Sequence, residues 1–330
     1  MVPATPLKPE ALDMDLLREM YRGGAVNIAG IDPRLNATRI AKRLRVGRAR
    51  VAARLRAWTA SGLLVRYEVW LNPALIGWRG AAVNIRVEHP RVKAAVFHRL
   101  GMIDGAVMAM EFLGEWITLA LVAPDAAALE RRASLIRGLA GVKDVEPPIH
   151  WPVLEPQRRL TALDIRIVRA LRERPTATLS DAAHRVGIST RTMTRRYSAL
   201  VDDWAVWFVP IFDFRAISSP LVTLRILLRP EVDGDSVMRQ IGAQFPLNLA
   251  FRDLIAGSSA QSEVNLFVMP PSAAHLEDLE QFVSSIKGVV DLEMNIMIRL
   301  HSFRGWIDRH LEELSPRPTE LEKPRAGGRR

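Results

Sequence analysis

The sequence predicts an α+β protein made of two tandem copies of one unit. In each copy a winged or three-helix helix-turn-helix domain precedes a ferredoxin-like βαββαβ domain. Three observations lead to this prediction. The chain repeats itself, positive charge is confined to the first part of each repeat, and the hydrophobic spacing changes within each repeat from purely helical to mixed strand and helix.

The internal repeat has a period of about 150 residues, too long for a solenoid and suited to a duplicated two-part unit. Residues 11–18 (ALDMDLLR) match residues 162–169 (ALDIRIVR), and residues 141–146 (GVKDVE) match residues 288–293 (GVVDLE). The spacing between the copies changes little from one match to the next, which indicates a duplication. A chain of 330 residues is long enough for two or more domains with their own cores.

The composition excludes several classes of protein. The chain has no cysteine, so disulfides, thiolate metal sites and cysteine nucleophiles are excluded. No apolar run reaches the roughly 18 residues of a membrane span, and the N-terminal residues lack the pattern of a signal peptide. We therefore expect a cytoplasmic, nucleoid-associated protein. The formal net charge of +10 favours a polyanionic partner.

Positive charge is segregated along the chain. Residues 33–66 contain ten Lys or Arg and no acid, and residues 158–200 contain ten basic and three acidic residues. Residues 67–150 are neutral, whereas residues 201–313 have sixteen acids against nine bases. A merely solvated surface mixes both signs. The same segregation in both copies predicts two equivalent anion-binding modules on neutral or acidic scaffolds.

Both basic segments have the spacing of helix-turn-helix units. We expect first helices over residues 12–21 and 162–172, and tight turns at residues 45–47 and 187–189. Ser189 suits the N-cap of the helix that follows. The apolar positions of the third helices are Val51, Leu55 and Trp58 in the first copy and Met193, Tyr197 and Leu200 in the second.

The third helix of each unit is the expected recognition helix. Arg and Thr near its N-terminus suit base edges and phosphates in a major groove. The alternative interpretation is a solvated basic face, but such a face normally carries acidic partners four residues away, and these are scarce here. The predicted DNA-binding residues are Thr38, Arg39, Arg48, Ala49, Arg50 and Arg54 in the first copy, and Ser189, Thr190, Arg191, Thr192, Arg195 and Arg196 in the second.

The second part of each repeat has the order β-α-β-β-α-β, which is typical of a ferredoxin-like domain. Helices cover one face of such a sheet, and the other face needs a second sheet, which a tandem chain can supply itself. We expect the apolar alternations at Val83, Ile85, Val87 and at Val222, Leu224, Ile226 to form this contact. The predicted elements are residues 80–88, 92–100, 106–112, 116–122, 126–139 and 142–149, and then 221–228, 236–245, 247–256, 264–269, 273–286 and 289–298.

This order of domains resembles the Lrp/AsnC family of transcriptional regulators, with a linking strand over residues 63–71. The resemblance covers residues 11–300 and rests on residues 12–15 (LDMD), 40–44 (IAKRL), 54–55 (RL), 61–64 (SGLL) and 141–142 (GV). It implies DNA binding by the helix-turn-helix domains and assembly through the C-terminal RAM domains, so that one chain acts as a covalent pseudo-dimer. The implied domains are 1–66 and 156–203 for DNA binding, 67–155 and 204–313 for the RAM domains, and 314–330 as a basic disordered tail.

The same resemblance implies an effector loop with the pattern Gly, acid, aromatic, Asp. Gly114, Glu115 and Trp116 fit, but Ile117 replaces the last acid. The corresponding loop of the second copy is longer and lacks the pattern, and its candidate effector residues are Gly257, Ser258 and Ser259. An amino acid-like effector is the only small molecule that we expect. No metal site or cofactor is expected, because the seven histidines show no ligand spacing.

The function predicted from sequence is a sequence-specific, DNA-binding transcriptional regulator that is not an enzyme, with double-stranded DNA and further copies of the chain as partners. Two alternatives remain. One is an enzyme on the same fold that resembles the sirohaem decarboxylases, which would not need basic recognition helices. The other is a ligand-sensing interaction module whose DNA-binding units are degenerate.

Overall fold

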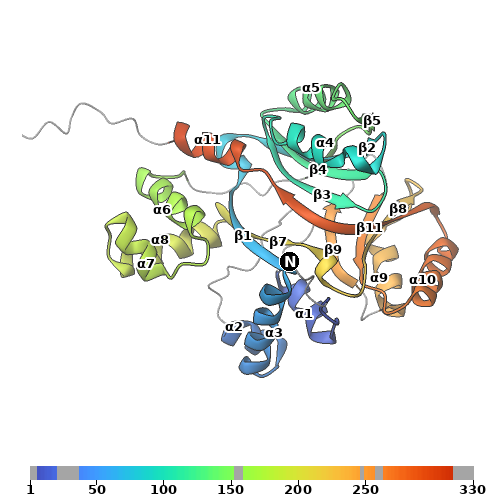
Figure 1. Cartoon of the computed structure of the whole chain (residues 1–330), viewed down its shortest axis with the longest axis horizontal. Helices are drawn as coiled ribbons and strands as arrows, with labels where there is room; N and C mark the ends of the chain where they lie inside the picture. The colour runs from blue at the N-terminus through green and yellow to red at the C-terminus, as the bar shows by residue number, and fades with distance from the viewer. Residues whose placement is uncertain (1–5, 21–36, 152–158, 246–248, 257–262, 315–330) are drawn as a thin grey trace, which may run out of the picture.

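The computed structural model describes residues 6–20, 37–151, 159–245, 249–256 and 263–314, and Figure 1 shows their arrangement. The fold is α+β with antiparallel sheets, as the sequence predicted. Residues 21–36 and the tail beyond Leu314 lie outside the described residues. Within the described ranges, no helix is both long enough and apolar enough to cross a membrane.

Six helices form two groups of three. In both groups the third helix buries apolar side chains from the predicted stripe. Val51 and Trp58 are buried in the first group, and Met193, Tyr197 and Leu200 in the second, whereas Leu55 is half-buried. The first helical group is α1 (Ala11–Met20), α2 (Ala37–Leu44) and α3 (Arg48–Ser61), and the second helical group is α6 (Ala162–Glu173), α7 (Leu179–Val186) and α8 (Thr190–Asp202).

A two-stranded ribbon lies between the helical groups and the main sheet (Figure 1). The linking strand β1 (Leu64–Leu71) was predicted, whereas its partner β7 (Val206–Phe212) was not. The strands are antiparallel, and Trp70 lies opposite Trp207. Because β1 follows the first helical group and β7 follows the second, this ribbon joins the two halves of the chain.

The main sheet has nine strands in the order β5-β2-β4-β3-β11-β8-β10-β9, with β6 paired to β2. Each half places its fourth strand beside its first, then its third and then its second, which is the ferredoxin-like order. The strand predicted over residues 142–149 is split in two. The elements of the first half are β2 (Arg79–Val87), α4 (Lys93–Leu100), β3 (Ala106–Phe112), β4 (Trp116–Ala123), α5 (Ala126–Arg137), β5 (Val142–Val145) and β6 (Ile149–Trp151). Those of the second half are β8 (Leu221–Leu228), α9 (Gly234–Gln244), β9 (Leu249–Ala256), β10 (Glu263–Val268), α10 (Ala273–Ser285), β11 (Val289–Ser302) and the unpredicted helix α11 (Gly305–Glu313).

The two halves of the sheet join edge to edge. The strand β11 continues to Ser302, beyond its predicted end at residue 298, and its last residues pair with β3 of the first half. At this seam the Glu111 carboxylate accepts a hydrogen bond from Arg299 Nε at 2.5 Å and pairs with His301 Nε2 at 2.8 Å. Burial alone would raise the pKa of Glu111, but His301 and Arg299 hold that pKa at about 2. The carboxylate is therefore charged at neutral pH and pairs across the two halves.

The prediction that the apolar faces of the two sheets pack against each other was wrong. Val83, Ile85 and Val87 pack beneath α4 and α5 of their own half, and Val222, Leu224 and Ile226 pack beneath α9 and α10. The helices need the most apolar face of the sheet, since their own apolar stripes have no other place to be buried. The opposite face carries a mixture of polar and apolar side chains. Part of it, including Met110, Phe112 and Phe267, joins the core shared with the ribbon and both helical groups.

Each helical group contacts the opposite half of the chain. Helix α6 of the second group packs against β1, and α1 of the first group lies against β9. Helix α11 packs against β3, and its backbone carbonyl at Leu311 accepts a hydrogen bond from Arg169 of α6. The two halves are thus interlocked rather than arranged as two independent beads.

Candidate nucleic-acid interface

The N-terminus of α8 presents polar side chains on a well-capped helix. Ser189 is the N-cap, as predicted, and its hydroxyl accepts a hydrogen bond from Thr192 N at 3.2 Å. The same hydroxyl donates to Thr192 Oγ1 at 3.0 Å, so these two predicted residues hold the helix end. Thr190, Arg191 and Arg195 are exposed. Neither arginine forms an ion pair with any residue that the structure describes, which leaves both guanidinium groups available to an anion.

The N-terminus of α3 is less regular. Gly47 occupies the N-cap and supplies no side-chain hydrogen bond. Arg48, Ala49 and Arg50 are exposed as predicted, and Arg50 lies 4.0 Å from the carboxylate of Glu10. Thr38 is exposed at the start of α2, whereas the side chain of Arg39 lies outside the described part of the chain.

Arg54, a predicted DNA-binding residue, faces two acidic side chains of the same helical group. Its Nε and Nη2 donate to the two carboxylate oxygens of Asp13 at 2.5 Å each, and Nη1 donates to Glu10 at 3.0 Å. Only 11% of the side chain is exposed, and Asp13 is fully buried. Asp13 is the chief reason that the pKa of Arg54 is raised above its ordinary value. Arg54 therefore fastens α3 to α1.

Arg196, also a predicted DNA-binding residue, occupies the equivalent place in the second helical group and likewise faces an aspartate. Its Nη1 lies 3.6 Å from Asp164 Oδ1, and Asp164 is fully buried at the start of α6. Thr161 and Asp164 form a capping box, in which each side chain bonds the backbone of the other. Both groups thus use an arginine of the third helix to neutralise a buried aspartate of the first.

The turn before α3 contains a backbone conformation that disfavours an arginine. Arg45 has φ 56°, in the left-handed region, where the second group has Gly187 with φ 75°. The left-handed conformation costs a non-glycine residue roughly 1–2 kcal/mol. Arg45 and Lys42, which lies three residues before it, are exposed and basic, and both were absent from the predicted DNA-binding residues. The sequence alone did not predict that both side chains are exposed beside this turn.

Replacing Arg45 by glycine is expected to stabilise the first helical group by about 0.5–1 kcal/mol, because the strain is relieved at some cost in unfolded-chain entropy. Urea unfolding measures the change. Arg45→Ala is the matched control, since it also removes the charge but keeps the strain. If both variants unfold at the same urea concentration, the backbone strain at this turn is absent in solution.

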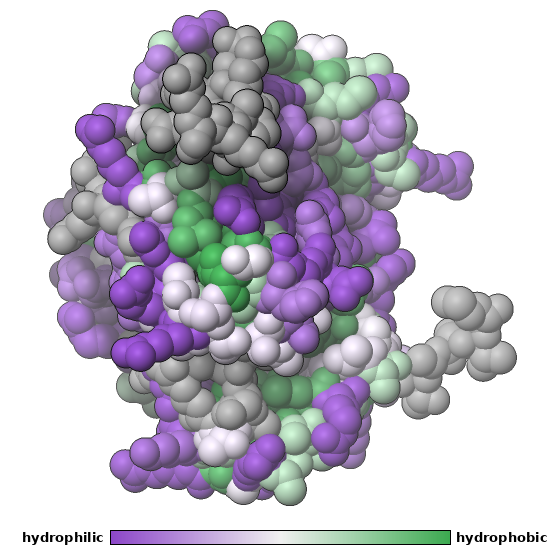
Figure 2. All heavy atoms as spheres, turned by 90° about the vertical axis from the view of Figure 1, so that its left-hand side faces the viewer, coloured by the Kyte–Doolittle hydropathy of each residue, from purple (hydrophilic) through white to green (hydrophobic). Residues whose placement is uncertain are grey.

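Figure 2 shows the side of the molecule that carries the second helical group. Hydrophilic side chains cover most of this side and surround a hydrophobic patch near its middle. In Figure 1 the second helical group lies to the left of the β1–β7 ribbon and the first lies below it, whereas α4, α5, α9 and α10 lie above the ribbon or to its right. The exposed basic residues of both groups are thus carried away from the helix-covered faces of the main sheet.

The predicted effector loop joins β3 to β4. Gly114 has φ 82°, which a glycine adopts readily in a tight turn. Glu115 accepts a hydrogen bond from Arg86 Nε at 2.8 Å, and this lowers the pKa of Glu115. Trp116 lines a pocket at the seam of the two sheet halves. Gly257, Ser258 and Ser259 lie outside the described residues. Trp116 is therefore the predicted effector residue that reaches a cavity.

The comparison with protein families identifies one part of the chain. A model of the AsnC-type helix-turn-helix domain matches residues 160–201, which span the second helical group. Residues 160–201 are an AsnC-type helix-turn-helix domain. The predicted resemblance to the Lrp/AsnC family is confirmed by this AsnC-type domain, which contains every predicted DNA-binding residue of the second copy. No curated protein matches the chain.

Several solved structures resemble the chain at low identity. Siroheme decarboxylase NirDL is 15% identical, with a TM-score of 0.49, over 92% of this chain and 98% of that chain. AsnC from E. coli is 15% identical over 46% of this chain and 97% of its own, with a TM-score of 0.29. The leucine response regulatory protein LrpA of Mycobacterium tuberculosis is 20% identical over 46% and 99%, with a TM-score of 0.29.

One prediction is corrected by these comparisons. The sequence favoured a protein that is not an enzyme, yet a chain similar to this one over 92% of its length is the enzyme siroheme decarboxylase NirDL. In the described part of the chain, no three His, Asp or Glu side chains are placed to hold a metal ion.

Proposed function

We propose that the chain is a sequence-specific DNA-binding transcriptional regulator that acts as a covalent pseudo-dimer, with DNA-binding parts at residues 1–66 and 156–203. One observation carries the proposal. The AsnC-type domain presents Arg191 and Arg195, exposed and without an acidic partner among the described residues, at the N-terminal part of its third helix. Arginines at this place of a helix-turn-helix unit reach guanine edges and phosphates in the major groove.

The first helical group supplies the second half of the interface in this proposal. Arg48 and Arg50 are exposed at the start of α3, in the position that Thr190 and Thr192 occupy in α8. The two recognition helices differ in sequence, so the expected operator is asymmetric rather than a perfect palindrome. Since the interlocked halves hold both groups on one scaffold, the second group binds at a high effective concentration once the first is bound.

Replacing Arg191 and Arg195 together by alanine is expected to weaken operator binding by roughly 1–3 kcal/mol for each arginine that reads a base. The same weakening is expected for Arg48→Ala with Arg50→Ala. Fluorescence anisotropy of the full chain on DNA selected from a random pool measures both. Arg229→Ala with Arg239→Ala is the control, because it removes the same charge from exposed sites of the second sheet half.

The other outcomes of this assay are informative. Equal affinity of all three double variants for the selected DNA would show that the recognition helices were wrongly assigned. A shift of the sirohaem absorption band on mixing, together with no retention of any DNA at low salt, would favour a tetrapyrrole enzyme. No DNA binding and no tetrapyrrole binding would favour an interaction module. In the proposal, chains also assemble into homo-oligomers, associate with the nucleoid and respond to an amino acid-like effector.

A further inference from the structure

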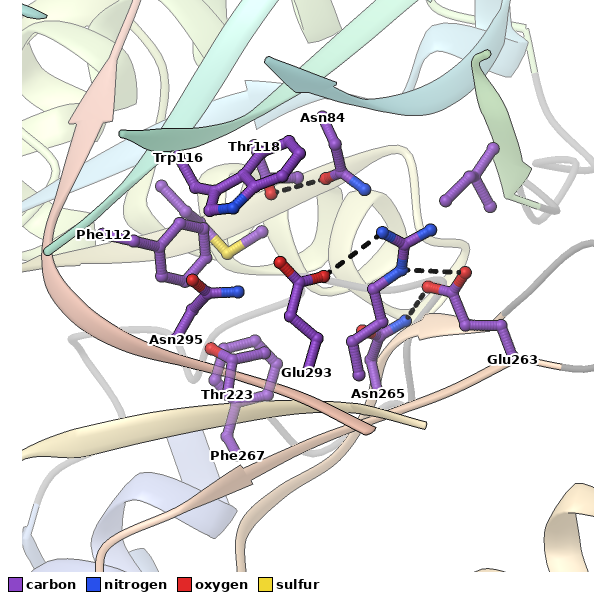
Figure 3. Close-up of a pocket in the computed structure, with 13 residues that line it drawn as sticks. Asn84, Phe112, Trp116, Thr118, Thr223, Glu263, Asn265, Phe267, Glu293 and Asn295 are labelled. Atoms are coloured by element: carbon purple, nitrogen blue, oxygen red, sulfur yellow. Dashed lines mark hydrogen bonds and ion pairs between the residues drawn. The ribbon is translucent and has the colours of Figure 1, made fainter. Parts of the chain in front are cut away.

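A pocket lined by polar and aromatic side chains lies on the face of the main sheet opposite α4, α5, α9 and α10, where the two halves approach each other (Figure 3). The first half contributes side chains from β2, β3 and β4, and the second half from β8, β10 and β11. About 470 Å³ of empty space, open solvent above the pocket included, lies between these side chains. Asn84 and Thr118 lie across the pocket from Thr223 and Asn295 in Figure 3. The pocket therefore exists only because both halves are present in one chain.

One arginine of this pocket faces three glutamates. Arg225 Nη1 donates to Glu146 at 3.0 Å and to Glu293 at 3.4 Å, and its Nε lies 3.2 Å from Glu263 Oε2. Burial alone would lower the pKa of Arg225, but the hydrogen bond to Glu146 and the charge of Glu263 raise it. The guanidinium is thus permanently charged. It compensates one of three carboxylates, which leaves an excess of two negative charges.

Three buried polar atoms of the pocket lack hydrogen-bond partners among the described residues. They are Thr223 Oγ1, Arg225 Nε and Glu263 Oε2, and the Glu263 side chain is only 2% exposed. Glu263 Oε2 has only its ion-pair contact with Arg225, while Glu263 Oε1 accepts a hydrogen bond from Asn265 at 2.8 Å. A buried acceptor that receives no hydrogen bond is destabilising, so a donor group that reaches such an acceptor in the pocket is bound more tightly.

Aromatic rings form the opposite wall. Phe112, Trp116 and Phe267 line the pocket, and in Figure 3 Phe112 and Trp116 lie beside each other at its edge. The face of an aromatic ring carries partial negative charge and attracts ammonium and guanidinium groups, most strongly in a desolvated site. Carboxylates on one side and aromatic faces on the other are the two features that recognise an organic cation.

We infer that this pocket binds a small organic cation, a primary ammonium group on a short aromatic or aliphatic body. The ammonium group donates to Glu293 and the Thr223 hydroxyl, and its body packs on Trp116 and Phe112. A ligand of net negative charge meets an excess of negative charge instead and is repelled. The site is separate from the DNA-binding surface, so binding can be measured without DNA.

The test is isothermal titration calorimetry of the full chain, without DNA, with three probes of one shape. Phenethylamine carries an ammonium group, 2-phenylethanol is neutral and phenylacetate is anionic. We expect phenethylamine to bind at least tenfold more tightly than 2-phenylethanol, and phenylacetate not to bind. Glu293→Gln and, independently, Trp116→Ala are expected to weaken phenethylamine binding at least tenfold.

Glu280→Gln is the matched control, because Glu280 is an exposed glutamate of α10 in the same half of the chain. It should bind phenethylamine as the unmodified protein does. Phenethylamine that binds no better than 2-phenylethanol would overturn the inference, as would phenylacetate of equal affinity. Undiminished binding to both Glu293→Gln and Trp116→Ala would place any bound amine elsewhere. Since no arm of this test contains DNA, a failure of the proposed regulatory function leaves its result unchanged.

Discussion

Replacing Arg54 by alanine is expected to lower the free energy of unfolding of the first helical group by about 3–5 kcal/mol, because it leaves the buried Asp13 carboxylate without its cation. Asp13 is fully buried and, among the described residues, would retain only the hydrogen bonds from Trp58 Nε1 at 2.6 Å and Glu10 N at 2.7 Å. Urea unfolding gives the magnitude, and hydrogen exchange over residues 37–61 shows whether the destabilisation is in this group.

Arg56→Ala is the control for Arg54, since Arg56 lies two residues away on the same helix and is exposed. Its expected effect on stability is within about 0.5 kcal/mol. Comparing the stability and the operator affinity of the two variants distinguishes an arginine that stabilises the fold from one that binds DNA. If Arg54→Ala kept the stability of the unmodified protein while binding the operator more weakly, Arg54 would be a DNA-binding residue after all.

Replacing Arg172 by alanine is expected to cost a similar amount, about 3–5 kcal/mol, because this buried arginine joins three elements. It lies on α6 and donates from Nη1 to the Val69 carbonyl of β1 at 2.7 Å, and from Nε to Asp308 of α11 at 2.5 Å. Its Nη2 donates to the Arg304 carbonyl at 3.2 Å, and its Nη1 lies 3.9 Å from Glu68 Oε2. The destabilisation therefore reaches beyond one helix.

The expected signature of Arg172→Ala is faster hydrogen exchange in both α6 and α11, in addition to a lower urea midpoint. Both helices should respond because a single guanidinium satisfies groups on each. Arg174→Ala is the control, since Arg174 is exposed at the C-terminal end of the same helix. Faster exchange confined to α6 would mean that Arg172 does not couple the AsnC-type domain to α11.

Much of the fold could be predicted from local spacing. The helices and strands of both halves lie within a few residues of their predicted bounds, and β3 and β8 have the bounds that were predicted. Ser189 was correctly predicted as an N-cap. These features depend on hydrophobic period and capping chemistry, which act between residues close together in the sequence.

The candidate site was predicted less completely, because sequence spacing could not separate two kinds of arginine. Arg191 and Arg195 are exposed, whereas Arg54 and Arg196 are turned toward aspartates of another helix. Arg54 and Asp13 are 41 residues apart in sequence, so no local sequence pattern predicts their contact. The charge run correctly indicated a basic segment, but the side-chain directions depend on how three helices pack.

By itself, the sequence determined the repeat, the place of its basic segments and the type of each main element, since these follow from residue types at short spacing. Only the tertiary structure decided that β11 crosses to β3, that β1 pairs with β7 and that α11 contacts the AsnC-type domain. It also decided that Glu146, Glu263 and Glu293 converge on Arg225. These backbone hydrogen bonds and ion pairs join residues that are far apart in the sequence. No short-range sequence pattern predicts them, because they depend on which residues the folded chain brings together.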